Sequence, residues 1–599
     1  MSITKFRKGF AAAGPVVAVL LGVAFIVGFL YRGSSPGQSP ADAQAQRAPA
    51  FTWEGESGYL DELMAQVNAS LTQNATPTEE WRFREQALNA VLNRVAPLVL
   101  AKRAGLTVSE DDVAAMAKEE AAFYADLFRT QAQAEYDNTT ARLTAEAQAA
   151  KEKGEASDEY KRAKKALDDH KAMSLDEFVK KQTGQTLSEV IKQQEKRLEQ
   201  TLLQPTERDR LRSQAARKKL QSKYESEVDT SDEALKRSYD EVTFERILIT
   251  EGANADPMGK AREVLGRIRS GMRFEDAAAE YSDTKKPDGS PDLAPMTLAR
   301  IDLKVMPLYK GVAELNEGDV SEPVQTPTGV AIYRVRKVES KVPEDFDRKK
   351  TERANQLRAS VSAAMVTRAV EDVIETDYDK IQWHDEGWRL VFDLKRIMAG
   401  QGPKGSERLA ELRRIVDKAQ SAVSSDADLP VYVRYMAFSQ LYAESSGEQK
   451  TGLEGLKAEV YAIVATVTRS TSFLFEYVDL LLEQKKGEEA LGVLKSIVAN
   501  SWEINDTNRE TVKKVERLKV QAANFAPPGS PAVEELQRAL DDWYASEKDQ
   551  LAIRKEQEEA MREAEEANRR EMENQGNASS KQNQPSDGGA GSGNKGAGG

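Results

Sequence analysis

Two runs of alternating apolar and polar residues, VTFERILIT at residues 242–250 and GVAIYRVRKV at residues 329–338, decide the fold of the middle of this chain. Alternation with a period of two is typical of half-buried β-strands. Between the runs, residues 258–281 carry apolar positions three and four apart, which predicts two short helices. Residues 282–292 are rich in Ser, Asp, Pro and Gly and should form turns. Because nearly everything else has a helical pattern, residues 240–340 are expected to form an α+β domain in a mostly α chain.

Short motifs in this domain resemble the parvulin family of prolyl isomerases. The motifs occur in the order expected for the family, and the resemblance implies the parvulin fold. Some other small α+β domain is the alternative. The matching segments are Ile247-Leu248-Ile249, FEDAA at residues 274–278, Tyr281-Ser282-Asp283, LNEGDVSEPV at residues 315–324 and Thr328-Gly329-Val330.

The resemblance also indicates where a catalytic site would lie. Active parvulins place two histidines and a cysteine or aspartate around a pocket for proline. In this sequence Arg246 stands at the first histidine position and Ala331 at the second. The cysteine or aspartate position falls on Thr284 or, with a shift of one residue, on Asp283. The catalytic candidates are therefore Arg246, Asp283 and Thr284.

Four apolar residues are candidates for binding a substrate peptide: Leu248, Met296, Met306 and Leu308. Leu308 falls near the position of the aromatic residue that floors the pocket in the family, and ordinary domain core is an equally good interpretation of each residue.

Isomerising an X–Pro bond lowers a torsional barrier of about 18–20 kcal/mol. Such a site needs an apolar pocket and polar groups that stabilise the twisted amide. Since the histidines belong to a linked network, their absence predicts weak or no activity. An active isomerase with an altered site is the alternative.

Composition narrows the classes of function. A chain of 599 residues should contain several domains. Its net charge of −13 makes nucleic-acid binding an unfavourable interpretation. The absence of cysteine excludes thiol catalysis, thiolate metal sites and disulfides. The two histidines, His170 and His384, are too far apart in sequence to suggest a metal site, so we expect no metal and no cofactor.

The first part of the chain predicts a membrane anchor. Three basic residues precede an uncharged run over residues 9–31, which is long enough to cross a bilayer as a helix. This charge asymmetry predicts that the N-terminus faces the cytoplasm. We expect a single-pass anchor in the inner or cytoplasmic membrane over residues 1–32, a flexible tether over residues 33–57, and the bulk of the chain in the periplasm or cell exterior. A cleaved signal peptide is the alternative, although the run exceeds its usual ~7–15 apolar residues.

Residues 58–239 are expected to form a helical module. Gly105 is placed to end one helix, and Pro97 should kink or split that same helix. Four hydroxyl residues followed three positions later by an acid predict capped helix starts. These pairs are Ser109/Asp112, Ser174/Glu177, Thr186/Glu189 and Thr230/Glu233.

The order of motifs in this module resembles the SurA/PpiD-type chaperones, in which a helical module precedes a parvulin domain. The resemblance is carried by QALN at residues 86–89 and AKRAGLTVS at residues 101–109. It implies that the module binds unfolded exported proteins and that residues 341–384 form a return helix onto it. Residues 130–170 fit the family poorly and are expected to form an extended helical hairpin.

The C-terminal part has no such resemblance. Residues 385–545 should be helical, and the stretch over residues 477–494 resembles one tetratricopeptide-type helix–turn–helix. A generic helical bundle is the alternative, and a protein partner is a possible role for this region. Residues 546–599 begin as a Glu/Arg/Ala-rich run without an apolar stripe, expected to be a solvated helix or disordered.

These observations predict a membrane-anchored extracytoplasmic folding factor that binds unfolded exported proteins, with a catalytically degenerate parvulin-like domain. The first alternative is an active peptidyl-prolyl isomerase with an altered site. The second is an assembly adaptor that acts through its C-terminal helices.

Overall fold

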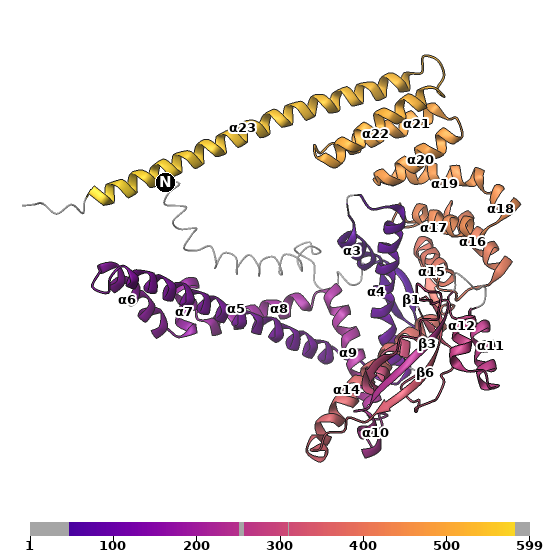
Figure 1. Cartoon of the computed structure of the whole chain (residues 1–599), viewed down its shortest axis with the longest axis horizontal. Coiled ribbons are helices and arrows are strands. Elements are labelled where there is room, and N and C mark those ends of the chain that lie inside the picture. The colour runs from indigo at the N-terminus through magenta and orange to yellow at the C-terminus, as the bar shows by residue number, and fades with distance from the viewer. Residues whose placement is uncertain (1–46, 73, 251–256, 310, 327, 582–599) are drawn as a thin grey trace, which may run out of the picture. The chain divides into compact units, whose positions relative to one another are not determined.

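The computed structural model describes residues 47–581, except residues 73, 251–256, 310 and 327 (Figure 1). The predicted anchor over residues 9–31 lies outside this part of the chain. In the described part, no helix combines the length and the apolar character needed to cross a membrane.

The chain divides into two compact units. The first contains the residues up to Gln66 together with Gln86–Trp388, and the second contains Val67–Glu85 and the residues from Arg389 onward. The second unit therefore includes a short segment taken from the N-terminal third of the sequence.

A three-stranded antiparallel sheet brings together distant parts of the first unit. Its order is β2-β1-β7, with β1 at Pro49–Trp53, β2 at Glu56–Tyr59 and β7 at Ile381–Trp383. Phe51 pairs with Trp383 across the β1–β7 ladder. Strand β1 begins inside the range that the sequence assigned to a flexible tether. A strand forms here because its apolar residues alternate: Phe51 and Trp53 are fully buried, while Thr52 between them is half-buried.

Helix α4 contacts this sheet, since Arg94 and Lys102 bond the backbone carbonyls of Ser57 and Glu54, and α14 lies along α9. This agrees with the predicted return of the chain onto its first module. Helix α4 continues through Pro97 without interruption, so the expectation of a split helix is wrong; Val95, Ala96 and Val99 are fully buried around the proline and hold both halves in the core. The helices are α3 (Leu60–Ser70), α4 (Pro77–Arg103), α9 (Pro205–Glu225), α10 (Asp232–Arg237) and α14 (Phe346–Thr376).

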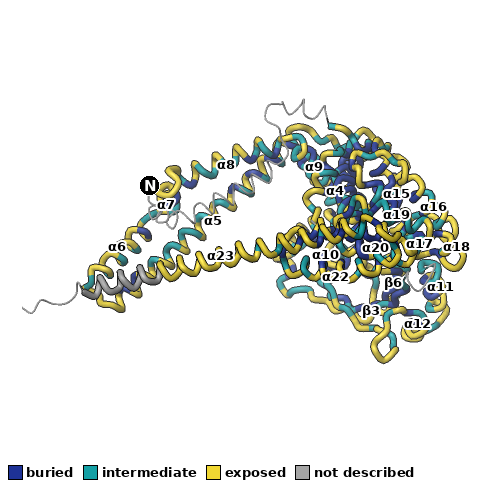
Figure 2. Tube along the Cα trace, turned by 90° about the horizontal axis from the view of Figure 1, so that it is seen from above, coloured by how far each residue is buried: buried dark blue, intermediate teal, exposed yellow. Residues whose placement is uncertain are grey.

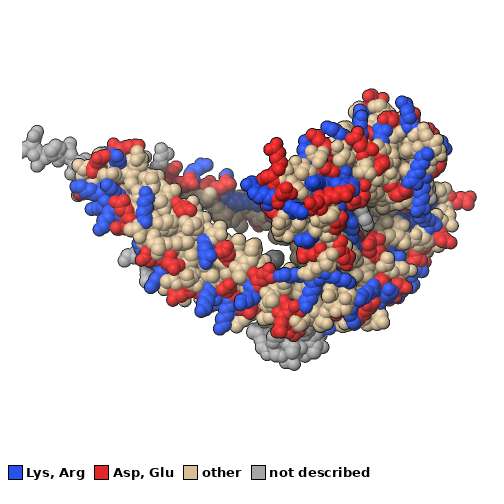
Figure 3. Space-filling model, turned by 90° about the horizontal axis from the view of Figure 1, so that it is seen from below, with Lys and Arg blue, Asp and Glu red and all other residues tan. Residues whose placement is uncertain are grey.

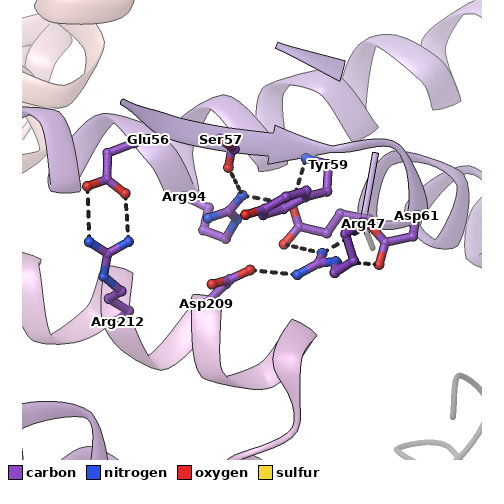
Figure 4. Close-up of polar contacts among 9 residues, drawn as sticks. Arg47, Glu56, Ser57, Tyr59, Asp61, Arg94, Asp209 and Arg212 are labelled. Atoms are coloured by element: carbon purple, nitrogen blue, oxygen red, sulfur yellow. Dashed lines mark hydrogen bonds and ion pairs between the residues drawn. The ribbon is translucent and has the colours of Figure 1, made fainter. Parts of the chain in front are cut away.

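A buried ionic cluster ties the start of the described chain to these helices (Figure 4). The Arg47 guanidinium lies 2.8 Å from Asp61, 3.3 Å from Glu62 and 2.6 Å from Asp209 of α9. Arg94 of α4 lies 2.8 Å from the Glu62 carboxylate. Burial raises the pKa of Glu62, while the charges of Arg94 and Arg47 oppose that shift. The basic and acidic charges of the cluster therefore balance one another, and the cluster fixes α3, α4 and α9 to the first described residues of the chain.

Four helices form an arm, with α5 (Glu110–Glu152), α6 (Asp158–Ala172), α7 (Leu175–Thr183) and α8 (Leu187–Leu202) lying side by side in Figures 1 and 2. Helices α5 and α6 pack together as the extended hairpin that the sequence predicted.

The predicted helix starts are largely confirmed. Capping boxes begin α5 at Ser109, α7 at Ser174 and α8 at Thr186. The fourth assignment is wrong by one residue, because Ser231 rather than Thr230 caps α10. Adjacent hydroxyl residues carry the same capping signal, so the sequence alone could not choose between them.

The α+β domain is present as predicted. Its antiparallel sheet has the order β4-β3-β6-β5. Helices α11 and α12 cover one face, and α13 and the short helix η1 lie toward the other. The elements are β3 (Glu241–Thr250), α11 (Pro257–Arg269), α12 (Phe274–Tyr281), β4 (Met296–Ala299), α13 (Arg300–Val305), η1 (Pro307–Tyr309), β5 (Val324–Thr326) and β6 (Gly329–Glu339).

The turn into β6 requires glycine. Gly329 has a φ of +149°, and a Cβ atom there would lie 2.1 Å from the carbonyl oxygen of Ile249. Any other residue would push β6 away from β3. This glycine therefore fixes the register that places the two central strands opposite each other.

The second unit is a series of helices, most of which pack against a helix close to them in sequence. The predicted helix–turn–helix over residues 477–494 is confirmed by α20 and α21, which meet at a tight turn. The helices are α15 (Glu386–Met398), α16 (Gly405–Ala419), α17 (Leu429–Glu444), α18 (Gly447–Thr451), α19 (Glu454–Val467), α20 (Thr471–Glu483), α21 (Gly487–Asn500), α22 (Asp506–Ala523) and α23 (Pro531–Lys581).

The first turns of α4 complete the core of this second unit. Arg84 is buried and bonds Asp426 at 2.8 Å and Glu80 at 2.6 Å. Its guanidinium also lies 4.7 Å from the ring centroid of Tyr432. Trp81, one turn earlier, is almost fully buried. No local pattern predicts that the first turns of α4 belong to the second unit, since this depends on contacts between residues far apart in the chain.

Helix α23 begins in the second unit and then loses its packing partners. Leu536, Leu540 and Trp543 are buried, whereas every side chain over residues 551–567 is exposed (Figure 2). Of the two predicted states for this charged segment, the structure has the solvated helix over residues 551–567, and residues 582–599 lie outside the described part of the chain.

Candidate functional site

Positions 246 and 331, which the resemblance assigns to the parvulin histidines, lie on adjacent strands of the α+β domain. In the β3–β6 ladder, Arg246 is directly opposite Tyr333 and Leu248 is directly opposite Ala331. Side chains two apart on a strand point to the same side of the sheet. Phe244, Arg246, Leu248, Ala331 and Tyr333 therefore share one face, which we call the β3–β6 face.

Aromatic rings pack on one end of this face. The ring centroids of Phe244 and Tyr309 are 5.3 Å apart, and Tyr333 lies 5.8 Å from each of them. The Tyr309 hydroxyl is 4.0 Å from the sulfur of Met296. Burial raises the pKa of Tyr333 to about 12, with Tyr309 adding to the shift and the charge of Arg246 opposing it. Tyr333 therefore stays neutral at physiological pH.

The Arg246 side chain is half-buried beside this cluster and has no salt bridge or hydrogen bond to any residue that the structure describes. None of its nitrogens is buried without a partner. The guanidinium can therefore reach solvent, or a ligand, on the β3–β6 face.

Asp283 and Thr284 lie at the outer edge of β3 and make local contacts. The Asp283 carboxylate accepts hydrogen bonds from the backbone N–H of Thr250 at 2.7 Å and from its hydroxyl at 3.0 Å. The Thr284 hydroxyl lies 3.0 Å from that of Ser282. The structure brings neither residue into contact with Arg246, and Asp283 holds the end of β3 in place.

The four apolar candidates divide into two pairs. Leu248 is buried and Met296 half-buried, and both belong to the core on this side of the sheet. Met306 and Leu308 are 40% and 36% exposed. The sequence analysis assigned no role to Tyr309 and Tyr333, although Tyr309 directly follows Leu308. A short helix presents adjacent residues in different directions, so the sequence could not tell which of the two would reach the sheet.

The histidines of the chain lie outside this domain. His170 of α6 is buried and stacks on Tyr136 with ring centroids 4.5 Å apart. His384 lies 3.2 Å from the hydroxyl of Thr52. In the described ranges, no group of three His, Asp or Glu side chains has a geometry suited to a metal ion.

Replacing Ala331 by histidine is expected to destabilise the protein by about 1–3 kcal/mol, because Ala331 is fully buried in the core beside Leu248 and the larger ring overpacks it. Arg246→His is the matched control, since position 246 is half-buried and should tolerate the change. Chemical denaturation of both variants measures the difference. Equal stabilities would mean that a cavity exists at Ala331.

Comparison with known proteins agrees with the fold of this domain. Residues 243–337 match the family model "Rotamase", described as a PPIC-type PPIASE domain. The chain is 30% identical over 166 residues to "Foldase protein PrsA 2" of Listeria innocua, covering 26% of this chain and 52% of the relative. It is also 30% identical over 159 residues to the same-named protein of Listeria monocytogenes, covering 25% and 50%. The chain thus spans about half the length of these curated relatives.

Solved structures give weaker similarities. A PpiC-type isomerase domain is 17% identical, covering 17% of this chain and 95% of that one, with a TM-score of 0.15. PrsA from Bacillus subtilis is 19% identical, covering 42% and 86%, with a TM-score of 0.14. A SurA-like chaperone of Campylobacter jejuni is 18% identical, covering 32% and 80%, with a TM-score of 0.13. At these TM-scores the structures do not bear on the arrangement of the whole chain.

The family match covers both central strands, both helices on the far side of the sheet, and the β3–β6 face. It lies within the same range that the strand alternation and the short motifs marked out. Residues 243–337 therefore form a PPIC-type, parvulin-like isomerase domain within a chain that is otherwise mostly helical.

Proposed function

We propose that this chain is a membrane-anchored, extracytoplasmic folding factor that binds unfolded or nascent exported proteins. In this proposal its PPIC-type domain has lost most of its isomerase activity. The family match over residues 243–337 and the similarity to foldases support a role in protein folding. The observation that carries the binding role is the exposed side of α5.

Helix α5 reverses the usual distribution of apolar residues. It packs through small residues, since Ala117, Ala121 and Ala125 are buried. On the opposite side, Phe123 is 65% exposed and Leu127 is 43% exposed. Large apolar residues normally occupy the buried stripe of a helix, and a patch of them in solvent is typical of an interaction site. Unfolded chains expose apolar segments whose burial contributes about 25 cal/mol per Å².

Charged residues surround this patch and should keep it soluble. Asp126 and Arg129 lie beside it, 3.1 Å apart and exposed. Basic and acidic side chains are interspersed over the face of the molecule in Figure 3. Such a mixed surface suits weak contacts with many apolar segments.

Suppression of client aggregation tests this proposal. The full-length chain should keep a chemically unfolded exported protein in solution, and Phe123→Ser with Leu127→Ser should remove most of that effect without changing stability, because both side chains are exposed. Leu551→Ser with Ile553→Ser, a second exposed apolar pair on the solvated part of α23, is the matched control and should keep most of the effect. A chain that suppresses no aggregation would refute the proposed function.

The loss of isomerase activity is supported by the β3–β6 face. By the resemblance, Arg246 and Ala331 stand at the family's histidine positions. The Asp283 carboxylate is already bonded to the backbone N–H of Thr250 at the end of β3. Arg246, Asp283 and Thr284 stay candidates for a residual activity, and Leu248, Met296, Met306 and Leu308 for peptide contacts. A pocket that lacks its polar network still offers apolar contacts, so a domain that has lost isomerase activity can still bind a peptide.

We propose that residues 9–31 anchor the chain in the cytoplasmic membrane with residues 33–599 outside, on the strength of the charge asymmetry around this run. Protease added to intact spheroplasts should digest the chain beyond the tether. A cytoplasmic protein followed in the same samples controls for lysis. Protection of the PPIC-type domain would contradict this topology.

A protein partner for residues 385–545 stays a prediction. A hollow of about 660 Å³ lies between α20 and α22. Its lining includes Glu476 and Asp479 on α20 and Lys514 on α22. The presence of both signs of charge favours a polar segment of another protein over an apolar one.

A further inference from the structure

We infer that the β3–β6 face selects peptide segments in which a carboxylate adjoins apolar residues, and that Arg246 binds the carboxylate. This rests on the proposed function, because it names the kind of client segment that the PPIC-type domain takes. The site is separate from the exposed side of α5, which binds apolar segments without regard to charge.

The first observation is that Arg246 stands apart from the other arginines of the sheet. Arg334 pairs with Glu245 and, at 2.7 Å, with Glu275. Arg336 lies 3.5 Å from Glu245. Arg246 has no such partner among the described residues, although it is half-buried. Partly burying an unpaired cation is unfavourable, so a ligand that pairs with it gains more than it would at an exposed lysine or arginine.

The guanidinium group also fixes the class of ligand. Its planar fork of N–H donors matches a carboxylate in a bidentate arrangement. Phosphopeptide sites use clusters of cations, whereas Arg246 is the basic residue among the five that define this face. The geometry therefore favours a single carboxylate.

The surroundings of Arg246 supply apolar contacts. Tyr309 reaches the face through its contacts with Phe244 and Tyr333, and this places η1 beside the face. Leu308 on η1 and Met306 just before it are both more than one-third exposed. A segment whose carboxylate reaches Arg246 can therefore lay its neighbouring apolar residues over Met306 and Leu308.

Fluorescence anisotropy with short labelled peptides tests the inference on the full-length chain. One peptide carries Glu among leucines and has an amidated C-terminus, and a second replaces Glu by Gln. A third combines Gln with a free C-terminal carboxylate, which separates a side-chain source of the carboxylate from a terminal one. The Glu peptide should bind about tenfold more tightly than the Gln peptide, as expected for one charge-assisted pair. High salt should reduce that difference.

Arg246→Gln should abolish the preference for Glu, and Arg246→Lys should keep part of it, because lysine retains the charge but not the fork. Arg262→Gln is the matched control. Arg262 is exposed on α11, which packs on the opposite face of the sheet. Circular dichroism of each variant verifies folding, and the lysine variant keeps the test valid if the glutamine variant unfolds.

Four outcomes would overturn the inference. The first three are equal binding of the Glu and Gln peptides, a preference that survives in Arg246→Gln, and a preference that Arg262→Gln also removes. The fourth is tighter binding of the third peptide than of the first, because the carboxylate would then come from a chain terminus and not from a side chain within the segment. If the chain suppresses aggregation but shows no preference for charge, the inference fails while the proposed function stands. If it suppresses no aggregation, the proposed function itself fails.

Discussion

Excising residues 241–340, with Asp240 joined to Lys341 by a short flexible linker, is expected to leave most of the aggregation suppression in place. Glu241 and Glu339 are directly opposite each other in the β3–β6 ladder. The two ends of the domain therefore lie about 4.5–5.5 Å apart. The excision also removes Ile301 from its buried cluster with Phe346 and Leu357, and breaks the bond from Arg368 to the Lys304 carbonyl at 2.7 Å.

Shortening the arm is expected to have the opposite effect. Excising residues 122–194 removes the exposed apolar side of α5 but keeps the cluster at the base of the arm, where Val113, Ala117, Ala121, Leu198, Leu202 and Leu211 pack together. We expect half-maximal suppression to require at least about tenfold more protein, equivalent to ~1.4 kcal/mol of binding. Light scattering during dilution of an unfolded client measures both variants.

The base of the arm has to be kept for this comparison to be informative. Removing the whole helical module would also remove Trp81 and Arg84, which are buried in the second unit. Loss of activity would then report a damaged core. If excising residues 241–340 abolishes suppression and shortening the arm does not, the client site lies on the PPIC-type domain.

The rate of prolyl isomerisation by the full-length chain should be at least about a hundredfold below that of a parvulin with both histidines. Removing one group that stabilises a transition state costs about 10²–10³ in rate, and this domain lacks two. The assay is cis–trans isomerisation of a proline tetrapeptide, with an active parvulin measured alongside. Arg246→His with Ala331→His should not restore the rate, because Ala331 sits in a packed core.

A rate equal to that of the active parvulin would contradict this account. Asp283, Thr284 and Arg246 would then be the first residues to replace, singly, in search of a substitute network. In the structure the Asp283 side chain bonds Thr250 and the Thr284 side chain bonds Ser282, while the Arg246 side chain bonds no described residue. These side chains would have to rearrange on binding substrate.

Local patterns made the domain predictable from sequence. The alternation in residues 242–250 and 329–338 corresponds to β3 and β6. The pattern predicts half-buried strands, whereas the structure buries both faces over residues 247–249 and 329–333. The capping boxes at Ser109, Ser174 and Thr186 are equally local, since each depends on side chains three residues apart.

Long-range features were not predictable in the same way. Strand β7 has three residues, too few to show a period, and pairs with β1 from the other end of the unit. Arg84 bonds Asp426, which lies 342 positions later in the sequence. Neither partner carries a local signal of the other, so these contacts follow only from the folded chain.

The candidate site was predictable in position but not in detail. Strand register follows from the motifs and puts Arg246 and Ala331 on one face. The aromatic cluster depends on how η1 turns Tyr309 toward Phe244. If η1 were rotated by one residue, Leu308 would face the sheet in place of Tyr309.

Site-specific photo-crosslinking tests the central claim most directly, namely that the arm holds unfolded clients. A photoreactive amino acid replaces Phe123 in the full-length chain, and an unfolded client is added before irradiation. Positions 129, exposed on the same helix, and 308, on the PPIC-type domain, carry the same group in control variants. This account predicts the strongest crosslinks from position 123. Crosslinks from position 308 with none from position 123 would contradict it.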